Sequence, residues 1–190
     1  SVMMFTPLYI ANHCENYCIY CGFNCHNKIR RAKLNADEIE KEKLDKILEA
    51  ARIAPTAANA QSQRLLVISS QEAKEKLSKG VNYHGAPLAI IVCGDHSDVF
   101  VRPFDKKDMV SVDATIVADH IVLEAEDLGL SSCWLTYFDP EIIRNEFNIP
   151  SNLEPIAIIA LGYADTEKAS PDRHSKDRKA LESLVCYETF

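Results

Sequence analysis

Four cysteines near the amino-terminal end of the sequence have the types and spacing best suited to chemistry. Cys14, Cys18 and Cys21 follow a C-x3-C-x2-C spacing, and Cys25 stands four positions further on. Three thiolates at this spacing can bind three irons of a cubane iron–sulfur cluster and leave the fourth iron open. Two other interpretations stay open: a structural zinc site completed by Cys25 or His26, and thiols that are inert or bind metal adventitiously.

The composition indicates an ordinary globular domain and limits its partners. The chain has 190 residues, 47% of them hydrophobic, and a formal net charge of −7. This charge disfavours a surface for nucleic-acid phosphates, so we expect no nucleic-acid partner. No apolar run approaches the ~18 residues that cross a bilayer, and the first residues lack the features of a secretory signal. We therefore expect no membrane partner and a cytoplasmic location.

Helical and strand-like patterns alternate after residue 42. Apolar residues at helical spacing, together with capping residues, predict helices over 43–54, 71–80, 112–129 and 140–147. Short apolar or β-branched runs predict strands over 64–70, 86–95, 131–138 and 154–163. Residues 1–42 lack this pattern, so we expect a cysteine-rich segment, 1–42, followed by an α/β or α+β domain, 43–190.

The larger part resembles the nitroreductase family of flavoproteins. The resemblance is carried, in order, by EKLDKILEAARIAPTAANAQSQRLLVISS, APLAIIVCGD, VDATIVADHIVLEAEDLGLSSCWLTYFDP, IPSNLEPIAIIALGYAD and KDRKALESLVCYE. It implies an α+β fold with a central, mainly antiparallel sheet flanked by helices. It also implies an interlocked homodimer that binds FMN at its interface and passes electrons from NADH or NADPH to an acceptor.

The resemblance assigns flavin contacts to two segments. The run from Pro55 to Gln61 is similar to the family's Pro-Ser-x-x-Asn-x-Gln turn, which implies flavin contacts for Thr56, Asn59 and Gln61. The family often continues with Pro-Trp, whereas this chain has Ser62 and Gln63. The second segment is a strand beside the flavin and implies contacts for Trp134, Leu135 and Thr136, although Trp134 is equally well explained as a core residue.

The resemblance also implies residues for the FMN phosphate. Lys176 and Arg178 match a basic pair near the carboxyl terminus, and a guanidinium fork suits a phosphate. Arg30 and Arg31 stand in place of an amino-terminal Arg-Arg-Ser-x-Arg stretch, with different spacing and without the serine. Residues 101–107 are expected to form a lid, and His120 to be a satisfied interface histidine.

The cysteine-rich segment has a resemblance of its own. The stretch FTPLYIANHCENYCIYCGFNCHNKIRRAKLNADEIEKE is similar to the cluster-binding segment of the radical S-adenosylmethionine enzyme of thiamine synthesis that cleaves tyrosine. That family needs a long α/β barrel around its cluster, and this resemblance ends within about forty residues. The segment alone is therefore not expected to be a radical enzyme.

Three functional hypotheses follow. The first is an FMN-dependent oxidoreductase that transfers hydride from NAD(P)H through flavin N5 to a small electrophilic acceptor; no single catalytic residue is required. The second keeps the flavin but delivers electrons through an iron–sulfur cluster on Cys14, Cys18 and Cys21. The third is a degenerate flavin-binding protein without enzymatic activity, motivated by the altered arginine motif and the missing Pro-Trp.

Overall fold

The computed structural model describes residues 39–164 and 178–190. Along these residues no helix is both long and apolar enough to span a membrane. The elements follow one another as helix α1 (Lys41–Ile53), 3-10 helix η1 (Ala57–Asn59), strand β1 (Gln63–Ile68), α2 (Gln71–Ser78), β2 (Leu88–Asp95), α3 (Val110–Asp127), β3 (Ser131–Leu135), α4 (Pro140–Glu146), β4 (Leu153–Gly162) and η2 (Leu181–Ser183).

The strands form one antiparallel sheet in the order β1-β2-β4-β3. This confirms the predicted α+β class and central antiparallel sheet. The predicted strand over 131–138 is too long, because pairing with β4 ends at Leu135 and the next two residues are exposed. The predicted helix over 112–129 begins earlier, at Val110, and ends at Asp127.

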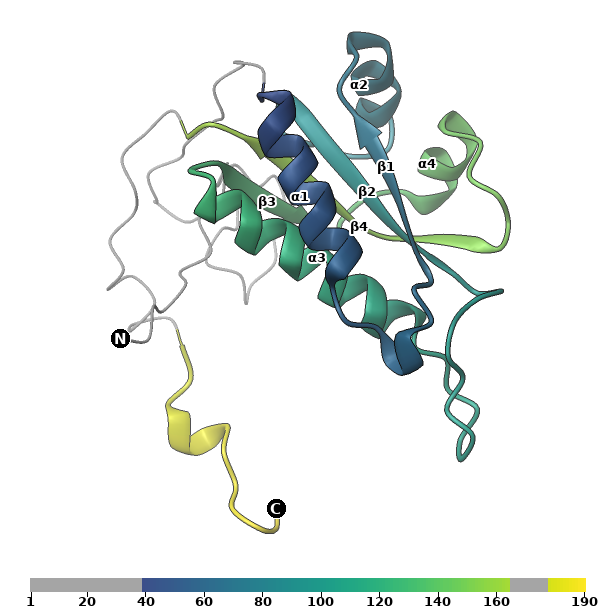
Figure 1. The fold of residues 1–190 in the computed structure, drawn as a ribbon, viewed down its shortest axis with the longest axis vertical. Helices are drawn as coiled ribbons and strands as arrows, with labels where there is room; N and C mark the ends of the chain where they lie inside the picture. The colour runs from purple at the N-terminus through teal and green to yellow at the C-terminus, as the bar shows by residue number, and fades with distance from the viewer. Residues whose placement is uncertain (1–38, 165–177) are drawn as a thin grey trace.

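Helices cover both faces of the sheet (Figure 1). Helices α1 and α3 lie side by side across one face, and α2 and α4 pack on the other. All eight residues of β2 are buried. Side chains alternate along a strand, so Ile90 and Val92 point towards α1 and α3 while Ala89 and Ile91 point the other way.

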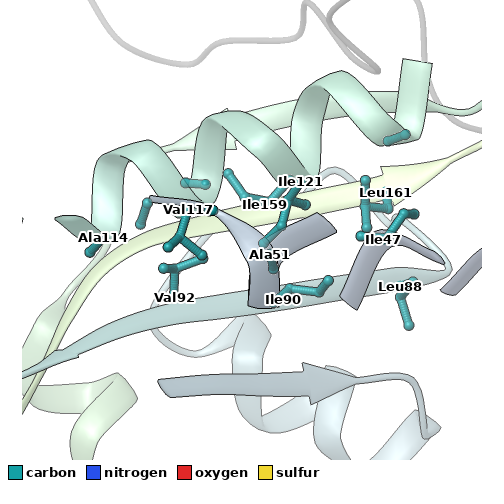
Figure 2. Close-up of a cluster of buried hydrophobic side chains, with 14 of the residues drawn as sticks. Ile47, Ala51, Leu88, Ile90, Val92, Ala114, Val117, Ile121, Ile159 and Leu161 are labelled. Atoms are coloured by element: carbon teal, nitrogen blue, oxygen red, sulfur yellow. The ribbon is translucent and has the colours of Figure 1, made fainter. Parts of the chain in front are cut away.

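The larger core lies between the sheet and the pair α1 and α3. Figure 2 shows Val117 and Ile121 of α3 facing Ile90 of β2 and Ile159 of β4, with Ala51 of α1 among them. All five are shielded from solvent. The apolar stripe read from the sequence therefore faces the sheet, and β2 and β4 form the centre of the fold.

A polar network anchors the carboxyl end of β2. One carboxylate oxygen of Asp95 accepts hydrogen bonds from the Ser97 backbone N–H at 2.9 Å, the Ser97 hydroxyl at 2.5 Å and the Asn152 amide at 2.9 Å. The other oxygen lies 3.3 Å from the Arg64 guanidinium. These partners hold the pKa of Asp95 at about 2, and the hydrogen bonds from Ser97 and Asn152 contribute most.

The central position of Ile90 predicts a large cost for truncating it. Ile90→Ala should lower the free energy of unfolding by about 2–5 kcal/mol, because it leaves a cavity between β2 and the helices. Urea denaturation measures this loss. Ile53→Ala is the matched control: Ile53 is 63% exposed, so its loss should stay within about 0.5 kcal/mol. Equal losses for the two variants would contradict the packing.

The Asp95 network predicts a defined acid dependence. In the native state the pKa of Asp95 is lowered from 3.8 to about 2. The stabilisation of the fold by the ionised Asp95 is therefore present above pH 3.8 and is lost as pH falls towards 2. Asp95→Asn should unfold more easily than wild type at pH 7, and the difference should shrink between pH 4 and pH 2. Urea denaturation at each pH measures it, with exposed Asp119→Asn as control; a constant difference would refute the assignment.

Candidate functional site

The loop between α1 and β1 has the most unusual backbone in the part of the chain that the structure describes. Ala58, Asn59 and Gln61 have φ values of 52°, 54° and 54°, and none of them is glycine. The left-handed conformation costs an ordinary residue roughly 1–2 kcal/mol, and such residues gather at functional sites. We call residues 56–62 the strained loop.

Hydrogen bonds inside the strained loop close it on itself. The Asn59 N–H donates to the Thr56 carbonyl at 2.9 Å, and the Ala60 N–H donates to the Ala57 carbonyl at 3.1 Å. The Gln61 N–H donates to the Thr56 hydroxyl at 3.0 Å. Thr56 thus shapes the loop through its side chain, and its hydroxyl keeps a proton to donate.

Two bonds join the strained loop to α3 and β2. The Ala57 N–H donates to the Asp113 carboxylate of α3 at 2.9 Å. At the other end, the Asp95 N–H donates to the Ser62 carbonyl at 2.8 Å. Asp113 was not among the predicted site residues, although the sequence carries a signal for it: an aspartate stands beside Ala114 on the apolar stripe of the predicted helix.

The loop residues predicted to contact flavin differ in exposure. The side chains of Asn59 and Gln61 are exposed, and Thr56 is half-buried. Only a long contact occupies the Gln61 amide, which lies 3.4 Å from the Asn59 carbonyl. Ser62 is 1% exposed, so it lines no open surface, and Gln63 is half-buried at the start of β1.

The second predicted group lies on β3. Trp134 is half-buried against the core formed with α1 and α3, whereas Leu135 packs against the opposite core. Thr136 follows the strand and is exposed. Trp134 thus packs as a core residue, and flavin contacts of Trp134, Leu135 and Thr136 stay a prediction.

The structure does not bring the two groups together within one chain. The strained loop leads into β1, and β1 and β3 are the two edges of the sheet. Two strands lie between them, which corresponds to about 14 Å at ~4.8 Å per strand. A ligand touching both groups must be long, as a dinucleotide or a flavin mononucleotide is, or be shared with a second chain.

The predicted lid is a small hairpin that follows β2. A bridge joins Val101 to Asp108, and the Arg102 guanidinium pairs with the Asp105 carboxylate at its tip. Phe104 is 95% exposed. Figure 1 shows the hairpin and the strained loop projecting from the same end of the sheet.

The remaining predicted residues are His120, the carboxyl-terminal basic pair and residues near the amino terminus. His120 is half-buried on α3, and its Nδ1 lies 2.9 Å from the Ile116 carbonyl oxygen, so this histidine is satisfied as expected. Residues 178–190 lie away from the sheet in Figure 1, and Arg178 is exposed there. The predictions for Cys14, Cys18, Cys21, Arg30, Arg31 and Lys176 fall outside the described residues.

Two other features do not form a site. Residues 39–164 and 178–190 contain no group of three or more histidine, cysteine or acidic side chains placed to hold a metal. An apolar cavity of about 210 Å³ beside Cys93 is smaller than the ~300–1,000 Å³ of ordinary ligand sites. Burial raises the pKa of the Cys93 thiol to about 11, so this cysteine is protonated and unreactive.

The amino-terminal resemblance is confined to a short stretch. The chain is 43% identical over 42 residues to 2-iminoacetate synthase of Salmonella typhimurium. This stretch is 22% of the present chain and 11% of that enzyme. The similarity thus covers a fragment of the synthase and leaves most of that protein unmatched.

Over most of its length, the chain is similar to proteins other than the synthase. Over 165 residues, 82% of this chain and 84% of the relative, it is 33% identical to a Methanothermobacter thermautotrophicus protein described provisionally as an NADH dehydrogenase/NAD(P)H nitroreductase. A nitroreductase family protein of Clostridium difficile 630 has a TM-score of 0.81 and 51% identity over 83% of this chain and 92% of its own. An FMN-dependent nitroreductase of C. difficile R20291 has a TM-score of 0.66 and 32% identity over 86% and 96%.

The family comparison agrees with these relatives. The Nitroreductase family model matches residues 29–82 and 79–163. The predicted fold and enzyme class, an NAD(P)H-dependent oxidoreductase of α+β architecture, are thereby confirmed. This chain therefore belongs to the nitroreductase family, whose model matches it from residue 29 to residue 163.

Proposed function

We propose that this chain binds FMN at the strained loop and passes electrons from NADH or NADPH to a small electrophilic acceptor. The single observation that carries the proposal is the loop itself: three of its non-glycine residues are left-handed, and two of them, Asn59 and Gln61, present exposed amide side chains. Strain of this kind persists where the surrounding structure holds a site ready for a ligand. The FMN-dependent nitroreductase among the structural neighbours supports the choice of cofactor.

The residues of the strained loop fit a flavin. The edge of an isoalloxazine ring presents both hydrogen-bond donors and acceptors, and a side-chain amide can meet either. Asn59 is exposed, and its amide has no hydrogen-bond partner within the described residues. Gln61 is exposed beside it, and the Thr56 hydroxyl retains its proton for donation.

In this proposal the chain binds and orients while the cofactor supplies the chemistry. FMN, when bound, provides hydride transfer between a nicotinamide and the acceptor. Asn59 and Gln61 would orient the ring through their amides, and Thr136 would contribute a hydroxyl from the end of β3. Arg178 and Lys176 would hold the phosphate, together with Arg30 and Arg31, which stand at the start of the family match at residue 29.

The chain lacks the Pro-Trp pair that the family often has at the end of the strained loop. Where the family often has Pro-Trp, Ser62 is buried and Gln63 is half-buried. Phe104 is an exposed aromatic residue of the lid hairpin, and the hairpin projects from the same end of the sheet as the strained loop. We propose that the lid, in place of the missing tryptophan, covers the acceptor.

The proposed assembly is a homodimer with the flavin at its interface. Large apolar side chains of the carboxyl-terminal segment stay exposed in one chain; they are Leu181, Leu184, Val185, Tyr187 and Phe190. Such side chains are stabilised by burial against another surface. In an interlocked dimer, a second copy of the chain would bury these side chains.

A second candidate function keeps the flavin and adds an electron entry. The 43% identity to 2-iminoacetate synthase over 42 residues favours it, because the resembling stretch includes Cys14, Cys18 and Cys21. A cluster on these thiolates would deliver single electrons to the flavin from a reduced protein partner. The two functions differ in iron content and in the electron donor.

Purification of the full chain under anaerobic conditions separates these functions. We expect one FMN per chain after reconstitution, no iron or sulfide, bleaching of the flavin absorbance by NADH or NADPH, and a solution mass twice the 21.3 kDa of one chain. Iron and sulfide beside flavin, with reduction by a ferredoxin but not by nicotinamide, would select the second function. Failure to bind FMN would exclude both and favour a degenerate protein.

Truncating the exposed amide of the strained loop tests the binding site itself. Asn59→Ala should weaken FMN binding about tenfold, because it removes one hydrogen bond worth ~1–1.5 kcal/mol to the ring. Quenching of flavin fluorescence measures the Kd. Asn145→Ala, an exposed residue of α4, is the matched control and should leave the Kd unchanged. Equal Kd values for wild type and Asn59→Ala would place the flavin elsewhere.

A further inference from the structure

A buried carboxylate on α3 stands directly against the strained loop. Asp113 lies in the first turn of α3 and is 1% exposed. One of its oxygens accepts the Ala57 N–H at 2.9 Å. Helix η1 begins at Ala57, so this hydrogen bond holds the loop at the residue immediately before its left-handed residues.

Within the described residues, the bond to Asp113 is the side-chain tether between the strained loop and an element other than β1, the strand into which the loop runs. The other side-chain bonds to backbone atoms of the loop come from Thr56, Gln61 and Arg64, all of them in or next to it. The Asp95 N–H holds the carboxyl end of the loop through a backbone bond to Ser62. Without Asp113, the strained turn has no side-chain anchor beyond its own neighbourhood.

The second carboxylate oxygen of Asp113 does not contribute to holding the loop. It is buried and has no hydrogen-bond partner among the described residues. An unpartnered buried carboxylate oxygen lowers the stability of the fold. An apolar residue of similar size would pack there without this cost, so global stability does not explain the aspartate, and the bond to Ala57 is what it provides.

We propose that Asp113 is a positioning residue that holds the strained loop in its flavin-binding shape before the cofactor arrives. This inference rests on the proposed function. A loop that is already ordered loses less conformational entropy when it binds a ligand, so preorganisation raises affinity. Asp113 touches no cofactor atom in this account; it acts through the Ala57 N–H, which fixes where Asn59 and Gln61 point.

Two variants remove the same bond from its two ends. Asp113→Leu replaces the acceptor with an apolar side chain of similar size. Ala57→Pro removes the donor without touching α3, and proline is tolerated in the first position of a helix, where Ala57 stands. Asp113→Asn keeps an acceptor oxygen and serves as the rescue variant, and Asp119→Asn, exposed on the same helix, serves as the control.

The full chain, purified without cofactor and then titrated with FMN, provides the readout. We expect Asp113→Leu and Ala57→Pro each to raise the FMN Kd at least about tenfold. The melting temperature of the cofactor-free protein should stay within about 4 °C of wild type for Asp113→Leu. Asp113→Asn and the control should bind like wild type. A purely structural role would instead lower stability and affinity together.

Hydrogen exchange on the cofactor-free protein keeps this inference separate from the proposed function. Amides 57–61 should exchange faster in Asp113→Leu, and amides 58–61 should exchange faster in Ala57→Pro, than in wild type and Asp113→Asn. If wild type binds no FMN, the proposed function fails while the exchange data still report on the anchor. Unchanged exchange, or wild-type FMN affinity in either variant that removes the bond, would overturn the role of Asp113.

Discussion

The burial of two central strands on both faces is the constraint on which the rest of this structure depends. β2 lies between β1 and β4, and β4 lies between β2 and β3, so the backbone groups of both strands are paired on each side. Their side chains alternate between a core with α1 and α3 and a core with α2 and α4. Because both faces are covered, polar groups are placed at strand ends and at the sheet edges, where loops meet solvent.

The candidate site follows from that arrangement. The strained loop connects α1, packed on one face, to β1, an edge strand, and must turn the chain within a few residues. The turn uses left-handed residues without glycine and is held by Asp113 at one end and the Asp95 backbone at the other. A rigid core therefore presents a preformed polar loop, which is the arrangement that ligand binding favours.

Much of the fold could be predicted from the sequence because its elements are strongly patterned. The continuous apolar run of β2 and the helical stripe containing Val117 and Ile121 lie where they were expected. The end of β3 was predicted too far along, since apolar Tyr137 and Phe138 continue the strand pattern after its pairing has ended. Sequence periodicity reports burial, and it cannot report where a partner strand stops.

The site was harder to predict because its key features are tertiary. Asn59 and Gln61 could be identified through a family motif, but the left-handed backbone at Ala58 carries no glycine to signal it. The contact between Asp113 and Ala57 joins residues 56 positions apart, and it depends on how α3 packs beside α1. The phosphate-binding residues proposed at Arg30, Arg31 and Lys176 lie outside the described residues, so only the motif supports them.

Amide hydrogen exchange with and without FMN is the direct test of whether the strained loop forms the flavin-binding surface. We expect FMN to slow exchange at residues 56–62, with a second protected segment at residues 134–136. Helices α2 and α4 should exchange at the same rate with and without the cofactor. Protection around the apolar cavity beside Cys93, with no change in the strained loop, would show that the flavin binds elsewhere.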